Sequence, residues 1–337
     1  MKKIQSILVF TTLLIIVFIH YPQPSINFHD GFRKPSEAPG ARKEWDAKRL
    51  SDPSTGKLPP NIHTKELVFA STLPNDLGNS NLEWVSEGPY NVGGRTRALA
   101  IDVTNENILI AGGASGGIWR TIDQGESWNK MTRPFQLHNV TCIKQDTRSG
   151  KENIWYHGTG ELTGSSASGS GAYFDGNGIY KSLDGGITWD SIPSTSDNNA
   201  AGSFNPWDFI WNIALDPSND IQDELYVASY GSIYRTINGG ESWTEELGGG
   251  NAYYNNVEIT STGVVYASLS SDGTDKGIWR STNGTEWTNI IPNNFPNIYG
   301  RTAIGINPSN ENEIYFLTAE TEGSGQYPDV FFGGEAW

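Results

Sequence analysis

The chain contains 337 residues, with 23 Lys and Arg against 38 Asp and Glu, and a single cysteine. Its length and its hydrophobic content of 36% suffice to bury a core, which excludes disorder throughout. A formal net charge of -15 argues against nucleic-acid binding, because phosphate contacts need a basic face. The lone Cys142 excludes a disulfide scaffold, and the five scattered histidines offer no ligand pair for zinc. We therefore expect no metal and no cofactor.

The amino-terminal residues 1–22 read as a secretory signal. Lys2 and Lys3 precede an apolar run over 7–19, which is shorter than the ~20 residues of a membrane-spanning helix. Because no small-x-small cleavage site follows, a cleaved signal peptide and an uncleaved signal anchor both stay open. We predict a bacterial protein that is secreted or held at the cell surface, with membrane contact only through this segment.

Residues 23–82 differ in composition from the rest and are predicted to form a leader with short helices. Helix-forming residues fill 41–50, and a second helical piece is expected over 64–71. The first 80 residues carry 10 basic and 7 acidic side chains, which leaves 13 and 31, a net charge of -18, for the remainder. The leader is thus either a solvated segment or a pro-segment that docks on the acidic domain over 83–337.

Four segments of the chain repeat one pattern. The first reads Gly117-Ile-Trp-Arg-Thr-Ile-Asp-Gln-Gly-Glu-Ser-Trp128, and variants of it cover 178–189, 232–243 and 277–287. The closing tryptophans lie 61, 54 and 44 residues apart. Such spacings indicate an array of supersecondary units that bury their apolar faces against one another.

Each repeat is predicted to contain four short strands and no helix. First strands are expected over 98–102, 210–215 and 302–306, and second strands over 108–111, 225–229 and 264–269. The third strand is the Gly-Ile-Trp segment, and the fourth starts at the closing tryptophan. This pattern predicts an all-β fold, a β-propeller of four-stranded blades. We expect at least four complete blades and a partial fifth, with its second strand over 313–319, in a propeller incomplete at its carboxyl end.

The turn that links the third and fourth strands is predicted to be structural. An Asp or Asn side chain accepts amide hydrogen bonds, a Ser or Thr hydroxyl does the same, a glycine supplies the positive φ, and the tryptophan folds back over the turn. Each turn offers one carboxylate or amide, too few for a calcium site. These residues are Thr121, Asp123, Gly125, Trp128, Ser182, Asp184, Gly186, Trp189, Thr236, Asn238, Gly240, Trp243, Ser281, Asn283 and Trp287.

This motif resembles the Asp-box, or BNR repeat, of sialidases, xyloglucan-cleaving endoglucanases, photosystem assembly factors and the sortilin luminal domain. The resemblance covers about residues 90–320 and implies the fold more strongly than a function. Two further parts of the chain are similar to large exported bacterial proteins. One lies in the leader, over 49–60 and 66–74, and the other consists of Gly88-Pro-Tyr-Asn-Val-Gly-Gly-Arg-Thr-Arg97 and Ala111-Gly-Gly-Ala-Ser-Gly-Gly-Ile-Trp119. Those proteins are often labelled glycosyl hydrolase or sortilin-like and commonly end in a type IX secretion sorting domain, so the resemblance implies a fragment.

Candidate site residues follow from propeller geometry. The loops that enter the first strands lie on the same face as the loops between second and third strands, close to the central funnel. These loops carry the candidate ligand-binding residues Arg95, Arg97, Trp207, Asp208, Asp272 and Arg301. Glu161 and Asp175 are the catalytic candidates, since glycoside hydrolysis needs two carboxyl groups across the bond. The Gly/Ser-rich stretch 164–171 between them reads more simply as a flexible loop.

Both enzymatic resemblances leave alternatives open. Resemblance to sialidases implies that Arg95 and Arg301 grip a carboxylate, but pairing of an arginine with an acid of a neighbouring blade is favoured. Resemblance to the endoglucanases implies a catalytic aspartate in the first blade, where this chain has Ala114 or Ser115. That family's second catalytic aspartate lies in a second propeller. Four aromatic residues could form a sugar-stacking platform, although core packing is favoured: Trp207, Trp211, Tyr253 and Tyr254.

The sequence favours a binding or scaffolding module for carbohydrate or other cell-surface polymers over an enzyme. The alternative is a glycoside hydrolase of the sialidase or xyloglucan endoglucanase type, with its remaining catalytic residues in sequence beyond this chain. A second alternative is a sortilin-like propeller that binds extended peptides. The acidic composition excludes nucleic acid from the expected partners.

Overall fold

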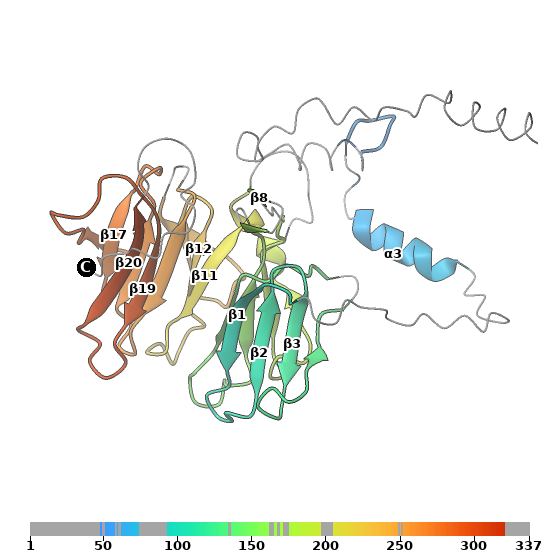
Figure 1. Ribbon diagram of the computed structural model, residues 1–337, viewed down its shortest axis with the longest axis horizontal. Helices are drawn as coiled ribbons and strands as arrows, with labels where there is room; N and C mark the ends of the chain where they lie inside the picture. Colours follow the sequence, from blue (N-terminus) through green and yellow to red (C-terminus); the bar gives the residue numbers. More distant parts are fainter. Residues whose placement is uncertain are drawn as a thin grey trace, which may run out of the picture.

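The leader contributes one described helix. The computed structural model describes residues 48, 51–57, 59, 62–73, 93–133, 136–161, 165–166, 169–170, 175–196, 205–248, 250 and 252–320. Helix α3 (Ile62–Thr72) confirms the helix predicted over 64–71 and lies outside the sheets (Figure 1). Of the helix predicted over 41–50 only Lys48 is described, and it is helical. The predicted signal lies outside the described residues, and none of the described helices is long and apolar enough to cross a membrane.

In the described part of the chain, four antiparallel four-stranded sheets and the two-stranded sheet of a partial fifth blade follow one another, and a second two-stranded sheet lies in a loop of the second blade. The first blade contains β1 (Thr96–Ile101), β2 (Leu109–Gly113), β3 (Gly117–Thr121) and β4 (Asn129–Lys130), and the second contains β5 (Cys142–Gln145), β6 (Trp155–Gly158), β9 (Ile179–Ser182) and β10 (Asp190–Ser191). The third contains β11 (Ile210–Leu215), β12 (Leu225–Ser229), β13 (Ile233–Thr236) and β14 (Thr244–Leu247), and the fourth contains β15 (Asn255–Ile259), β16 (Val265–Leu269), β17 (Gly277–Ser281) and β18 (Trp287–Asn289). The partial fifth blade contains β19 (Tyr299–Ile306) and β20 (Ile314–Glu320). Each complete sheet is a meander with its first strand innermost, so the predicted all-β propeller architecture is confirmed.

The predicted strands agree with the observed ones to within about three residues. Strands β11 and β12 match residue for residue, whereas β19 begins at Tyr299, three residues earlier than predicted. The stretch 164–171, which the sequence indicates to be a flexible loop, contains the paired two-residue strands β7 (Ser165–Ser166) and β8 (Gly169–Ser170). Backbone pairing needs no particular side chain, so a Gly/Ser composition does not exclude it.

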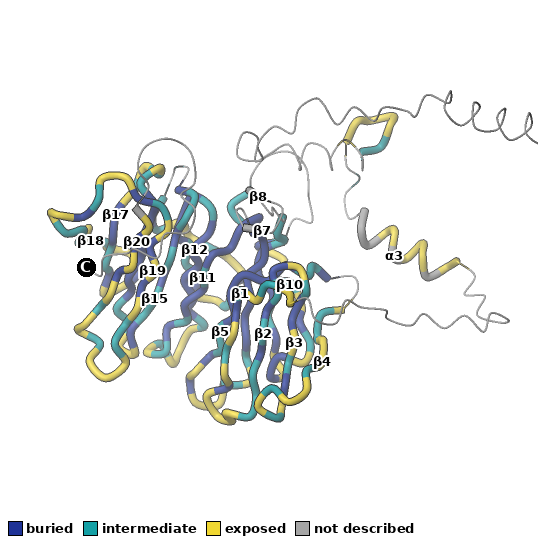
Figure 2. Tube along the Cα trace, in the orientation of Figure 1, coloured by how far each residue is buried: buried dark blue, intermediate teal, exposed yellow. Residues whose placement is uncertain are grey.

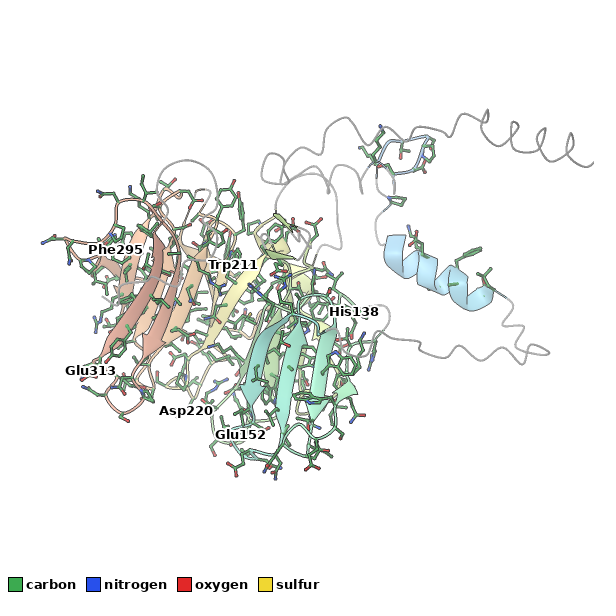
Figure 3. The ribbon with its side chains drawn as sticks, in the orientation of Figure 1. His138, Glu152, Trp211, Asp220, Phe295 and Glu313 are labelled. Carbon is green, nitrogen blue, oxygen red and sulfur yellow. The ribbon has the colours of Figure 1, made fainter. Side chains whose placement is uncertain are left out.

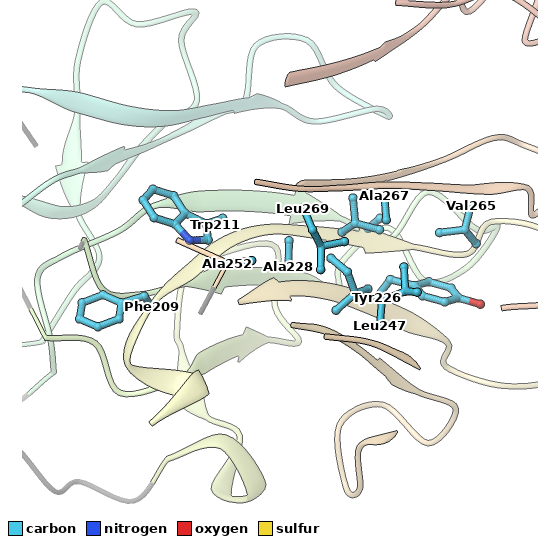
Figure 4. Close-up of a cluster of buried hydrophobic side chains, with 12 residues drawn as sticks. Phe209, Trp211, Tyr226, Ala228, Leu247, Ala252, Val265, Ala267 and Leu269 are labelled. Carbon is cyan, nitrogen blue, oxygen red and sulfur yellow. The ribbon is translucent and has the colours of Figure 1, made fainter. Parts of the chain in front are cut away.

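Among the residues that the structure describes, the core forms four apolar clusters, one between each pair of successive blades. The first cluster joins Ile110 and Val140 to Trp155 and Trp189, each at most 1% exposed. The cluster between the third and fourth blades, built around Tyr226 and neighbouring small side chains, is drawn in Figure 4. Figure 2 shows buried residues along the strands and exposed ones in the connecting loops. Packing between blades therefore supplies the core that no single blade has.

The repeated turns hold themselves together by hydrogen bonds. In the second blade the Ser182 hydroxyl accepts from the Gly186 amide at 2.9 Å and donates to Asp184. Asp184 in turn accepts from the Thr188 amide and hydroxyl, and the Trp189 Nε1–H donates to the Gly186 carbonyl at 3.0 Å. The first blade repeats these bonds, while the Trp243 indole donates instead to the Ser194 hydroxyl. The structural role predicted for these turn residues agrees with this network.

The glycines of these turns also allow the blades to approach closely. Gly186 has φ of +81°, and a Cβ there would lie 2.2 Å from Cδ1 of Ile110 in the preceding blade. Gly240 has φ of +98°, and a Cβ there would lie 3.0 Å from Ile192. The turn glycines thus serve two functions, the positive φ that was predicted and a contact between blades that was not.

Candidate functional site

The loops of the blades separate into two edges. In Figure 3, His138 and Phe295, which lie in the connections leading to β5 and β19, are at one edge of the sheets. Glu152, Asp220 and Glu313, from connections between first and second strands, are at the other edge. The loops that enter the inner strands therefore share a face, and the sequence predicts the ligand site at this face.

Irregular pairing at that face places one or two residues out of register in each of three inner strands. In β1 the register shifts between Thr96 and Ala98, which leaves Arg97 unpaired, and in β11 the shift leaves Trp211 unpaired. In β19 the shift between Tyr299 and Thr302 falls on Gly300 and Arg301. Such bulges re-aim side chains and are frequent next to active sites. The strands β5 and β15 pair without a shift.

The three re-aimed residues line one cavity of about 470 Å³ between the inner strands. This volume lies within the range of small-ligand sites. The polar part of its wall consists of amides and hydroxyls, notably Asn212 on β11 and Asn255 on β15, together with the cations Arg97, Lys144 and Arg301. Among the residues described, no Asp or Glu side chain lines this cavity.

An ion-pair network lies beside the cavity. Both guanidinium Nη atoms of Arg95 donate to the two carboxylate oxygens of Glu161, each at 2.5 Å. The Nε of Arg97 lies 3.4 Å from the same carboxylate, and the Glu161 side chain is only 1% exposed. A bidentate pair fixes both partners and satisfies the buried carboxylate. The favoured alternative for Arg95, pairing with an acid of a neighbouring blade, is confirmed.

Arg301 stands apart from this network. Its guanidinium lies 5.8 Å from the centre of the Trp211 ring, a cation-π contact. Desolvation, and next the charge of Arg97, lower the pKa of Arg301, so two cations are held together at the cavity. No hydrogen bond or ion pair joins the side chain of Arg301 to the part of the chain that the structure describes. Trp211 itself is 6% exposed and belongs mainly to the core.

The other predicted ligand-binding residues do not join this cavity. Asp208 is buried and its carboxylate accepts from the Asn205 amide at 3.0 Å, in a capping box at the 3-10 helix η3 (Pro206–Asp208). Trp207 packs against Tyr234 and Trp243, with ring centres 4.8 and 5.1 Å apart. Asp272 lines a separate hollow of about 610 Å³, together with tyrosine rings. The structure therefore divides the six candidates among three places.

The two catalytic candidates occupy different environments. Both oxygens of Glu161 are engaged with Arg95, whereas the main-chain carbonyl of Asp175 accepts from the Asn139 amide at 2.6 Å. In the first blade, Ala114 is buried and its amide donates to the Arg95 carbonyl, while Ser115 is exposed. Across the described part of the chain, no group of three or more His, Cys, Asp or Glu residues is placed to hold a metal.

The aromatic residues considered as a sugar platform pack mainly within the core. Tyr254 contacts Trp211 with ring centres 5.1 Å apart, and Tyr253 contacts Tyr230 edge to face. Both tyrosines pack on the cluster between the third and fourth blades. The favoured core interpretation is confirmed for these residues, with Trp211 also forming part of the cavity wall.

Sequence reasoning missed the amides of the cavity wall. Asn212 donates to Asn256 and to Glu258, and Glu258 also pairs with Lys144 at 3.1 Å. These polar side chains occur on inner strands whose other residues are apolar, and that interruption is the signal that could have found them.

Comparison with known proteins finds sequence similarity to xyloglucanases. No protein-family model matches the chain. The sequence is 25% identical over 333 residues to a xyloglucanase from Paenibacillus sp., covering 82% of this chain and 30% of that protein. It is 26% identical over 212 residues to Xyloglucanase Xgh74A from Acetivibrio thermocellus, covering 52% and 22%. The crystal structure of the Niastella koreensis GH74 enzyme has a TM-score of 0.49 at 21% identity, covering 67% of this chain and 34% of that one. The chain thus spans less than a third of the length of these curated relatives.

Proposed function

We propose that the chain is part of an exported, glycoside hydrolase-like propeller that acts on a polysaccharide. The sequence similarity to xyloglucanases over 82% of the chain carries this proposal. It favours the hydrolase alternative over the binding module that the sequence alone favoured. Because the chain spans 30% of that relative, the activity of the whole protein rests on residues both within and beyond it.

The cavity between the inner strands is the proposed glycan site. Sugar recognition needs an apolar ring surface together with hydrogen-bonding groups for hydroxyls. Trp211 supplies ring surface, and Asn212, Asn255 and Asn256 supply amides, all on the cavity wall. Loops on the same face, including the hollow that contains Asp272, extend the surface along which a polymer chain lies.

Glu161 serves this site as a positioning residue. A general acid must carry a proton and approach the glycosidic oxygen. Both oxygens of Glu161 accept from Arg95 and the carboxylate is buried, so we assign it the task of fixing Arg95 and Arg97 at the cavity. The catalytic carboxyl groups then come from outside the residues described.

A polysaccharide-binding protein without hydrolytic activity is the second candidate. The resemblance to endoglucanases implies an aspartate in the first blade, and Ala114 and Ser115 stand there instead. A propeller that retains the glycan cavity without a carboxyl group at that position would bind without cleaving.

Two assays on the full chain test the proposal. Reducing-end release from xyloglucan and retention on immobilised xyloglucan are measured for the native protein and for Asn212→Leu, with the exposed Asn312→Leu as a control. We expect binding that Asn212→Leu weakens about tenfold, since a lost amide contact costs ~1 kcal/mol or more. Release of sugar ends supports the hydrolase, and binding without release supports the second candidate. Failure to retain any polysaccharide would contradict both.

A further inference from the structure

We propose that the cavity between the inner strands binds a carboxylate-bearing sugar, so that the polysaccharide is an acidic one. This inference rests on the proposed function and specifies its substrate class. The charge of this cavity is opposite to that of the whole chain. The chain has 38 acidic against 23 basic side chains, whereas the described wall of the cavity contains three cations and no carboxylate.

The nearby carboxylates neutralise these cations only in part. Glu161 is saturated by the bidentate pair with Arg95 and approaches Arg97 only at 3.4 Å. Glu258 is shared between Lys144 and Asn212. The four cations Arg95, Arg97, Lys144 and Arg301 stand against the two carboxylates of Glu161 and Glu258, which leaves two positive charges at the site. An incoming anion would relieve their mutual repulsion.

The backbone is arranged to present these groups. Arg97, Trp211 and Arg301 each occupy the register shift of a different inner strand, in the first, third and fifth blades. Three independent irregularities that converge on one cavity indicate a built site, because a regular pleat would aim these residues elsewhere. Arg301 is exposed to solvent there, and its guanidinium lies over the ring of Trp211.

Three of the six buried side-chain atoms without a hydrogen-bond partner among the described residues belong to the cavity wall. The Nε of Arg97, the Nε1 of Trp211 and the Oδ1 of Asn255 have no hydrogen-bond partner among the described residues. Trp211 is 6% and Asn255 is 3% exposed. Buried polar groups are normally satisfied, and two donors and one acceptor match a sugar that carries both a carboxylate and hydroxyls. A guanidinium offers a carboxylate two parallel hydrogen bonds.

Binding of paired glycans to the full chain tests the inference. The probes are galacturonan and glucuronan fragments, each beside its carboxyl-reduced form, with neutral xyloglucan as a third ligand. The variants are Arg301→Gln and Arg301→Lys, and Lys276→Gln is the control because it removes one exposed charge away from the cavity. The Arg301 side chain makes no hydrogen bond to a described residue, so its replacement should leave the fold intact, and thermal unfolding verifies this.

We expect at least one acidic fragment to bind about tenfold more tightly than its reduced form, with an affinity that falls as salt is added. Arg301→Gln should remove that preference, Arg301→Lys should retain part of it, and Lys276→Gln should not change it. Equal binding of acidic, reduced and neutral glycans would overturn the inference and leave the proposed function standing. If the chain binds none of these glycans, both the inference and the proposed function are wrong. The same holds if the chain binds only peptides with a free carboxyl terminus.

Discussion

The turns between third and fourth strands and the cavity between the inner strands use polar residues in opposite ways. In the turns, Ser182, Asp184 and their equivalents satisfy one another, and the same bonds recur from blade to blade. In the cavity, the residue at the register shift differs from blade to blade, being Arg97, Trp211 or Arg301. Polar atoms of Arg97 and Trp211 have no hydrogen-bond partner among the described residues. Polar groups that are satisfied locally stabilise the fold, while groups left unsatisfied are available to a ligand. Changes in the blades should therefore reduce stability, and changes in the cavity should reduce binding.

The largest effect is expected at the closing tryptophan of the second blade. Trp189 is 1% exposed between the first two blades, so Trp189→Ala should lower the free energy of unfolding by about 3–5 kcal/mol. Trp119→Ala is the matched control, because Trp119 is 38% exposed on β3 and should cost much less. Chemical denaturation measures both. Equal losses would show that these tryptophans do not seal the contact between blades.

The next effect concerns acid stability and His157. Burial lowers the pKa of His157 to about 4, and the ring stacks on Tyr180 at 4.9 Å. The unfolded chain takes up a proton near pH 6.5, so this contribution is full above pH 6.5 and is lost as the pH falls towards 4, on the order of 3 kcal/mol in all. His157→Phe keeps the stacked ring and should flatten the stability profile over that range. An unchanged slope in unfolding titrations would contradict the assignment.

A smaller loss is expected from the turn hydroxyl. Ser182 is 1% exposed and accepts the Gly186 amide, so Ser182→Ala leaves that amide without its partner. We expect a loss of about 1–3 kcal/mol in the free energy of unfolding, with no change in glycan affinity. Ser309→Ala, at an exposed position where only the amide is bonded, should change neither quantity. Weaker binding by the Ser182 variant would remove the distinction between the two regions.

The smallest effect is expected from Asp184→Asn. Burial would raise the pKa of Asp184, but hydrogen bonds from Thr188 and Ser182 outweigh it, so the pKa lies below its usual value. The resulting stabilisation is present above about pH 4 and is lost as the pH falls through the lowered pKa. Asn238 and Asn283 occupy the equivalent positions and make similar bonds. The variant should therefore lose a small part of its free energy of unfolding at pH 7 and lose less further stability in acid than the native protein; a large loss at pH 7 would contradict this.

The fold was predictable because its determinants are local. Each blade carries its own turn, whose residues lie within a dozen positions of one another, and the repeat reveals them. The site was predictable only in part. Arg97 and Arg301 belong together, but the pair of Arg95 with Glu161 spans 66 residues, and Asp272 and Trp207 lie elsewhere. The register shifts that aim Arg97, Trp211 and Arg301 depend on the partner strand, so no local pattern announces them.

The division between the two regions is tested most directly by measuring stability and glycan affinity together for Ser182→Ala and Arg301→Gln. We predict a crossover: the first variant unfolds at lower denaturant and binds normally, and the second unfolds like the native protein and loses affinity for the polysaccharide. If Arg301→Gln lowers stability without affecting binding, the cavity belongs to the architecture and the assignment of the site is wrong.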